Sequence, residues 1–187
     1  MNSNCIHLFK YYKLLGEKTF SQLNDEQLFA APNSTCNSIS ILVQHLWGNM
    51  MSRWTDFLNS DGEKEWRNRD EEFESILQSR DEMLVKWNEG WACLFKALGS
   101  LQEADYQKII YIRKQGHTVT DAIHRQLAHY AYHVGQIVYA GKLIKEGHWE
   151  SLSIPKNESD AYNRQKFSQQ KETIHFTNEY LNKGMKE

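Results

Sequence analysis

The sequence predicts an all-α protein, and three observations support this fold class. The chain of 187 residues holds only two prolines, Pro32 and Pro155, whereas a β-rich chain of this length would use more turn residues. Apolar side chains recur at helical spacing over long stretches. Hydrophobic residues make up 40% of the chain, which is enough to form the core of one folded domain. We expect a single four-helix-bundle domain over residues 1–187, with a peripheral tail at 155–187.

Four long helical segments account for most of the chain. Each combines an apolar stripe with start or stop signals, and a short capped turn through Phe29 follows the first. In the third, Ser79 and Glu82 fit a capping box, and Gly99 is a stop signal. The fourth carries two apolar stripes, which predicts a central helix or one shared with a second subunit. The expected ranges are about 4–23, 38–58, 79–99 and 118–145.

Two connections are distinctive. Ten of the fourteen residues from Asp61 to Glu74 are charged, which predicts a solvated connection with a charged helical turn. Its length would let the second and third helices run in the same direction. Residues 106–119 include the β-prone run 109–112, and Gln115-Gly116 could form a turn. This predicts an extended segment or small hairpin before the fourth helix.

Composition disfavours several classes of function. A net charge of −2 argues against a nucleic-acid-binding surface. No run approaches 18 apolar residues, so no membrane span is expected. The first ten residues lack a secretory pattern. Cys5, Cys36 and Cys93 lie far apart, which favours reduced thiols in a cytoplasmic protein over a disulfide framework.

His129 and His133 are the first candidate for chemistry. On a helix, a spacing of four places both imidazoles on one face, where they can share a metal ion. Such a pair also arises by chance in a chain with eight histidines. His45 strengthens the metal interpretation, because it lies on an apolar helix face of the same expected bundle. Three separate buried imidazoles would each need hydrogen-bond partners, whereas one metal ion would satisfy all three.

A three-histidine site would leave at least one coordination position open for water or substrate. Imidazole ligands suit Zn, Ni, Fe or Cu, so they do not identify the metal. Asn49, Gln126 and Gln136 lie one turn from the histidines. They could orient the imidazoles or a bound substrate, and ordinary hydrogen bonding within the bundle is an equal alternative for them.

Other site classes fit the residues poorly. The HExxH protease motif needs a glutamate where Tyr130 stands, and no di-iron Glu-x-x-His pattern occurs. Cys93 falls beside the Trp87 and Trp91 stripe, which favours a buried, inert thiol.

The stretches Ile41-Leu42-Val43-Gln44-His45-Leu46-Trp47-Gly48-Asn49 and Arg125-Gln126-Leu127-Ala128-His129-Tyr130-Ala131-Tyr132-His133-Val134-Gly135-Gln136-Ile137 together resemble the DinB/YfiT-like superfamily, and more narrowly its branch of small bacterial proteins. The resemblance runs from the first helix to about Pro155. It implies a four-helix bundle, often dimeric, with a divalent metal, typically nickel or zinc, held by His45, His129 and His133.

The resemblance also suggests an activity. Some relatives are metal-dependent S-transferases that use low-molecular-weight thiols, others look like hydrolases or isomerases of thiol adducts, and many have no known activity. We therefore expect a metal-dependent enzyme acting on a small-molecule substrate, with Asn49 and Gln126 as candidate substrate or supporting contacts. The alternative is a non-catalytic, stress-related bundle in which the metal is structural or regulatory. A homodimer is expected in either case.

Overall fold

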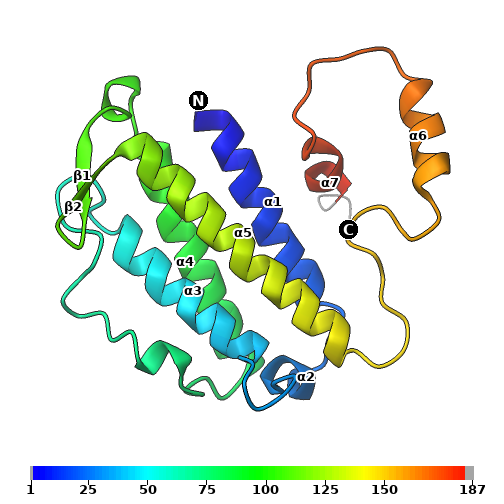
Figure 1. Cartoon of the computed structure of the whole chain (residues 1–187), viewed down its shortest axis with the longest axis horizontal. Helices are drawn as coiled ribbons and strands as arrows, with labels where there is room; N and C mark the ends of the chain where they lie inside the picture. Colours follow the sequence, from blue (N-terminus) through cyan, green and yellow to red (C-terminus); the bar gives the residue numbers. More distant parts are fainter. Residues whose placement is uncertain (1, 184–187) are drawn as a thin grey trace.

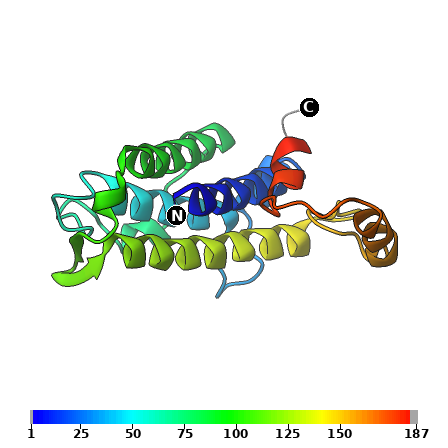
Figure 2. The ribbon, with the colours of Figure 1, turned by 90° about the horizontal axis from the view of Figure 1, so that it is seen from above.

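The computed structural model describes residues 2–183 and is all-α apart from one small hairpin. Four long helices lie side by side (Figure 1). Both α1 and α3 contact α4 and α5, so α4 and α5 occupy opposite corners of the bundle (Figure 2). Met1 and residues 184–187, the ends of the expected single domain, lie outside the described residues. The long helices are α1 (Asn2–Phe20), α3 (Ile39–Trp54), α4 (Arg80–Ser100) and α5 (Val119–Ile144).

Helix starts follow the predicted caps. Asn24 begins the short helix α2 (Asp25–Phe29) with a complete capping box. The side chains of Ser38, Ser79 and Thr118 each accept a backbone N–H at the starts of α3, α4 and α5. The box predicted at Ser79 is only half formed, because the Glu82 carboxylate accepts the N–H of the preceding residue, Gln78. Helix α4 also runs past the expected stop at Gly99, through Ser100.

Helices α3 and α4 run in the same direction, as the long connection predicted. Trp47 on α3 bonds Glu89 on α4, and Thr55, further along, lies 3.7 Å from Cys93. The contacts therefore advance together along both helices. Residues 55–79, which we call the α3–α4 connection, join them and contain the 3-10 helix η1 (Glu71–Phe73).

The expected hairpin is present, but its turn is not where the sequence indicated. Strands β1 (Ile109–Ile112) and β2 (Gln115–Thr118) pair antiparallel, after the 3-10 helix η2 (Glu103–Asp105). The turn is Arg113-Lys114, whose φ angles are 54° and 62°, and not Gln115-Gly116. Two non-glycine residues hold this left-handed backbone because the Asp61 carboxylate accepts both of their N–H groups, at 2.8 Å each.

The core is aromatic at its centre. Phe9, Trp91 and Tyr130 are completely buried, with ring centroids 5.9–6.4 Å apart. The Trp54 indole N–H donates to the Tyr130 hydroxyl at 2.9 Å, and that hydroxyl donates to the Asn49 Oδ1 at 3.1 Å. These contacts fix α3 against α5 next to His129 in the chain.

The tail forms two short helices, α6 (Ser159–Phe167) and α7 (Asn178–Lys183). It returns to α1, where the rings of Phe176 and Tyr180 contact Tyr11 at centroid distances of 6.0 and 5.2 Å. In Figure 1, α6 stands clear of the bundle. Among the described residues, no helix is long and apolar enough to cross a membrane.

Candidate metal centre

The structure brings His45, His129 and His133 together. His45 comes from the middle of α3, and the other two lie one turn apart on α5. The Nε2 atom of His129 lies 3.4 Å from the Nε2 of His45 and 3.1 Å from the Nε2 of His133. His45 is 4% exposed, while His129 and His133 are half-buried, so the cluster can be reached from solvent on one side.

These distances fit a metal ion. A tetrahedral cation bound at about 2.0–2.1 Å sets its ligand nitrogens about 3.3–3.4 Å apart, close to both observed separations. One potential ligand atom from each histidine lies within 4.8 Å of the others. Among the described residues, no cysteine or carboxylate joins this group as a fourth ligand. The cluster therefore has the geometry of an open three-nitrogen site.

Hydrogen bonding directs two of the three lone pairs inward. His45 Nδ1 lies 2.9 Å from the Glu72 carboxylate, and His133 Nδ1 lies 2.9 Å from the Gln136 Oε1. Both partners are acceptors in this arrangement, so each Nδ1 carries the proton and each Nε2 presents a lone pair. The Nε2 lone pairs of His45 and His133 therefore converge near the Nε2 of His129, and this convergence favours a bound cation.

Burial keeps the α5 histidines neutral. It is the main cause that lowers the pKa of His129 from 6.5 to about 3, with further contributions from His133 and His45. Burial and His45 lower the pKa of His133 to about 4, against the opposing hydrogen bond to Gln136. Metal ligation requires the neutral imidazole, so both rings are ready to bind near neutral pH.

Glu72 is the important site residue that the sequence did not indicate. It lies in η1 and is 6% exposed. Its Oε2 contacts His45, and Arg67 holds both of its oxygens, with Nε to Oε1 at 2.6 Å and Nη2 to Oε2 at 2.8 Å. Burial alone would raise the pKa of Glu72, but the hydrogen bonds from Arg67 and His45 outweigh it and hold the pKa below its ordinary value.

The expectation of a solvated connection is therefore wrong at its centre. Arg67 and Glu72 are buried as a pair, although the residues around them are charged and mostly exposed. The signal that could have found this contact is Gly48. A glycine inside a helix, one turn after His45, often marks a close approach, and here a Cβ would lie 2.3 Å from the Glu72 Oε1.

The tentative supporting residues lie close by in different settings. Gln136 bonds His133 directly. The Asn49 Oδ1 is engaged by Tyr130, in the core beneath the site. Gln126 is buried, one turn before His129, and both the Gln126 Oε1 and the His129 Nδ1 are buried without a hydrogen-bond partner. The supporting or substrate-contacting roles of Gln126 and Asn49 both stay predictions.

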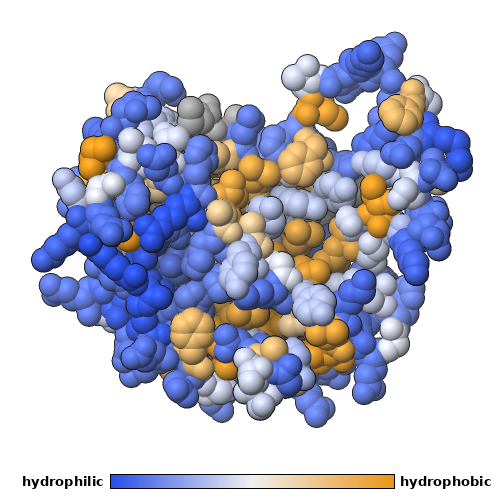
Figure 3. Space-filling view, in the orientation of Figure 1, coloured by the Kyte–Doolittle hydropathy of each residue, from blue (hydrophilic) through white to orange (hydrophobic). Residues whose placement is uncertain are grey.

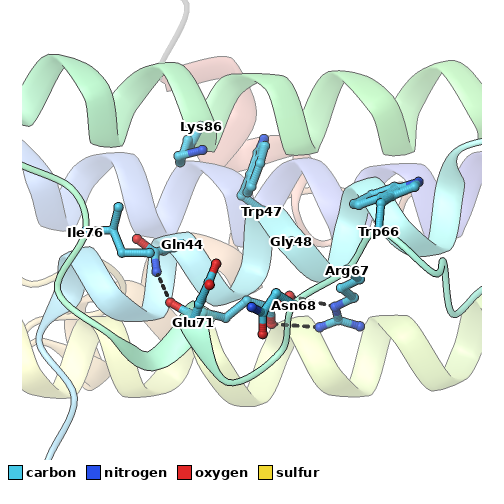
Figure 4. Close-up of a pocket in the computed structure, with 10 residues that line it drawn as sticks. Gln44, Trp47, Gly48, Trp66, Arg67, Asn68, Glu71, Ile76 and Lys86 are labelled. Atoms are coloured by element: carbon cyan, nitrogen blue, oxygen red, sulfur yellow. Dashed lines mark hydrogen bonds and ion pairs between the residues drawn. The ribbon is translucent and has the colours of Figure 1, made fainter.

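A pocket adjoins the Glu72 carboxylate. It has a volume of about 200 Å³ and lies between α3, α4 and the α3–α4 connection (Figure 4). Gly48, Arg67 and Glu72 line it, together with Trp47 and the exposed Trp66.

Residues 2–158 match the model of a family described as a protein of unknown function, DUF1572. No curated protein and no solved structure is similar enough to count as a match. The matched segment contains the three histidines and Glu72, and it ends before α6. Because the match covers most of its length, the chain belongs to the DUF1572 family.

Proposed function

We propose that this protein binds a divalent metal ion through the Nε2 atoms of His45, His129 and His133. The observation that carries the proposal is that the His129 Nε2 lies 3.4 and 3.1 Å from the Nε2 atoms of His45 and His133, close to the spacing of ligand nitrogens around a tetrahedral cation. The neutral state of the α5 histidines supports it. The DinB/YfiT-like resemblance adds nickel and zinc as the metals to test first.

We further propose that the open coordination position serves catalysis on a small thiol-containing substrate. A structural zinc site is usually closed by four protein ligands, and only three ligands gather here among the described residues. The nearest carboxylate, Glu72, is already held by Arg67 and His45. A bound metal would lower the pKa of a thiol and hold it as thiolate.

Among the residues that the structure describes, no cysteine belongs to this centre. Cys93 contacts Thr55, which directly follows the last residue of α3. Cys93 is not part of the histidine cluster. A low-molecular-weight thiol would therefore come from solution. In an S-transferase reaction its sulfur forms a bond to an electrophilic carbon, the leaving group departs with the electron pair of its bond, and the thiol proton passes to solvent. The histidine pair is only half-buried, so it is accessible from solvent.

The test compares purified protein loaded with nickel or zinc with chelator-treated protein, using bacillithiol or cysteine as the thiol and chlorodinitrobenzene as the electrophile. Metal-dependent chloride release above the uncatalysed rate would support the enzyme. Stoichiometric metal with no turnover on any thiol or electrophile would favour the non-catalytic alternative. The absence of bound metal would contradict the proposal as a whole.

A second copy of the chain is the proposed partner. Helix α5 exposes Tyr132, Tyr139 and Leu143 along one side, with exposed fractions of 64%, 66% and 57%. Apolar residues also gather over α1 and α5 in the space-filling view (Figure 3). Large exposed apolar side chains in one row favour association. Sedimentation of the protein and of a Tyr139→Ser variant would test the homodimer, which the variant should weaken.

A further inference from the structure

The α3–α4 connection is fastened to the same turns of α3 that carry His45. The Gln44 side-chain amide donates to the backbone carbonyls of Glu71 and Glu74, at 2.8 and 3.1 Å. Figure 4 shows the Gln44–Glu71 bond at one end of the pocket and the Arg67 guanidinium at the other. The Phe73 ring stacks on the His45 ring, with centroids 4.8 Å apart and an interplanar angle of 27°. Residues 71–74 thus make backbone contacts with Gln44 and ring and carboxylate contacts with His45.

Gly48 makes this approach possible. Its missing side chain leaves the space that the Glu72 carboxylate occupies, because a Cβ there would fall 2.3 Å from Oε1 and 2.8 Å from Cδ. The displaced group would be a charged, buried carboxylate with three hydrogen bonds, and it could not move without breaking some of them.

The contact has a defined effect on His45. A carboxylate can only accept, so the His45 Nδ1 must donate, and the lone pair of the neutral ring lies on Nε2. The negative charge also makes the imidazole a stronger ligand, as in carboxylate–histidine–metal arrangements. Arg67 balances that charge inside the protein, which keeps the carboxylate ionised without solvent.

We propose that Glu72 is a positioning residue of the metal centre, acting through His45, and that metal occupancy and closure of the α3–α4 connection are thermodynamically coupled. The proposal rests on the proposed metal-binding function. Coupling follows because the Glu72 bond to His45 both strengthens ligation and holds the connection in place. By reciprocity, metal binding then stabilises the closed connection by the same factor by which closure tightens metal binding.

Two variants separate this role from a merely structural one. Glu72→Gln retains the shape and an acceptor oxygen but removes the charge. Gln44→Ala removes two hydrogen bonds that anchor the same connection but leaves the Glu72 bond to His45 in place. Metal affinity is measured by competition with a chromogenic chelator, using zinc, and the ligand field is followed by the visible spectrum of the cobalt form. We expect about a 10–100-fold loss of affinity and an altered cobalt spectrum for Glu72→Gln.

For Gln44→Ala we expect less than about a threefold loss and an unchanged cobalt spectrum. Equal losses in the two variants, or no loss in Glu72→Gln, would overturn the positioning role. If Glu72→Gln fails to fold, as judged by circular dichroism, Glu72→Asp takes its place. That variant keeps the charge but is one methylene shorter, so it should weaken the His45 bond, and wild-type affinity would refute the proposal.

Two further measurements complete the test. Limited proteolysis of the wild-type protein within residues 64–69 should slow when zinc is added, and Glu72→Gln should reduce this protection. Nitrogen NMR of the metal-free protein should show His45 protonated at Nδ1, and Glu72→Leu should change that tautomer balance. The NMR result does not need a metal ion. An unchanged tautomer therefore refutes the role of Glu72, whereas wild-type protein that binds no zinc refutes the proposed function.

Discussion

The metal centre has two sides that differ in how directly the sequence specifies them. On the α5 side, His129 and His133 stand one turn apart on a regular helix, and burial is the main cause that keeps them neutral. On the other side, His45 depends on a carboxylate that arrives from an irregular, charged connection 27 residues later in the chain. Helical periodicity builds the first side, whereas tertiary contacts build the second.

The largest expected effect comes from His129→Ala. Its Nε2 lies close to both other ligand nitrogens, so its removal takes away the central one of three ligands and leaves only two. We expect metal content to fall from about one ion per chain to nearly none, measured by elemental analysis. His124→Ala is the matched control, because His124 is exposed on the same helix and should leave metal content unchanged. Equal metal content in both variants would show that His129 is not a metal ligand.

The α5 side of the site could be predicted because it needs only local geometry. A spacing of four on a helix places two imidazoles on one face, and His45 joined them because it lies on an apolar helix face in the same bundle. Glu72 could not be predicted in this way. Irregular backbone has no period, and a charged run gives no sign of which member is buried. The prediction of the hairpin turn was wrong for the same reason, since the Asp61 carboxylate that stabilises Arg113-Lys114 lies about fifty residues earlier.

The next prediction concerns the pH dependence of the metal-free protein. In the unfolded chain both α5 histidines titrate near pH 6.5, whereas in the folded protein their pKa values are about 3 and about 4. Below pH 6.5 the unfolded state therefore binds protons that the folded state does not. Stability should fall as the pH drops from about 6.5 towards about 4, and these histidines should add no slope above that range.

Urea unfolding midpoints of the chelator-treated protein at several pH values measure this effect. Carboxylates also titrate at low pH, so the comparison is with a His129→Leu, His133→Leu double variant. Its stability should fall less steeply between about pH 6.5 and pH 4. Parallel profiles for the two proteins would show that burial does not hold these imidazoles neutral.

Gly48→Ala tests the Glu72 contact, which the sequence did not reveal. The new methyl group would meet the Glu72 carboxylate at 2.3 Å and push it away from His45. We expect about a 10-fold or greater loss of zinc affinity, measured by chelator competition, while the α5 histidines remain in place. Gly135→Ala on α5 is the matched control, because its Cβ would meet nothing within 4 Å and should improve helix propensity. Undiminished affinity in Gly48→Ala would mean that the site does not need Glu72.

The smallest expected effect lies beneath the site, where the two sides meet. Tyr130→Phe removes the hydroxyl that accepts from Trp54 and donates to Asn49, leaving both partners buried and unpaired. We expect a loss of about 1–2 kcal/mol in the free energy of unfolding, measured by urea denaturation of the metal-free protein. Zinc affinity should stay within about twofold of wild type, because the network supports the bundle and does not touch the ligand nitrogens. A large loss of affinity with little change in stability would instead place Asn49 in the site, and the tentative substrate-contact role predicted for it would gain support.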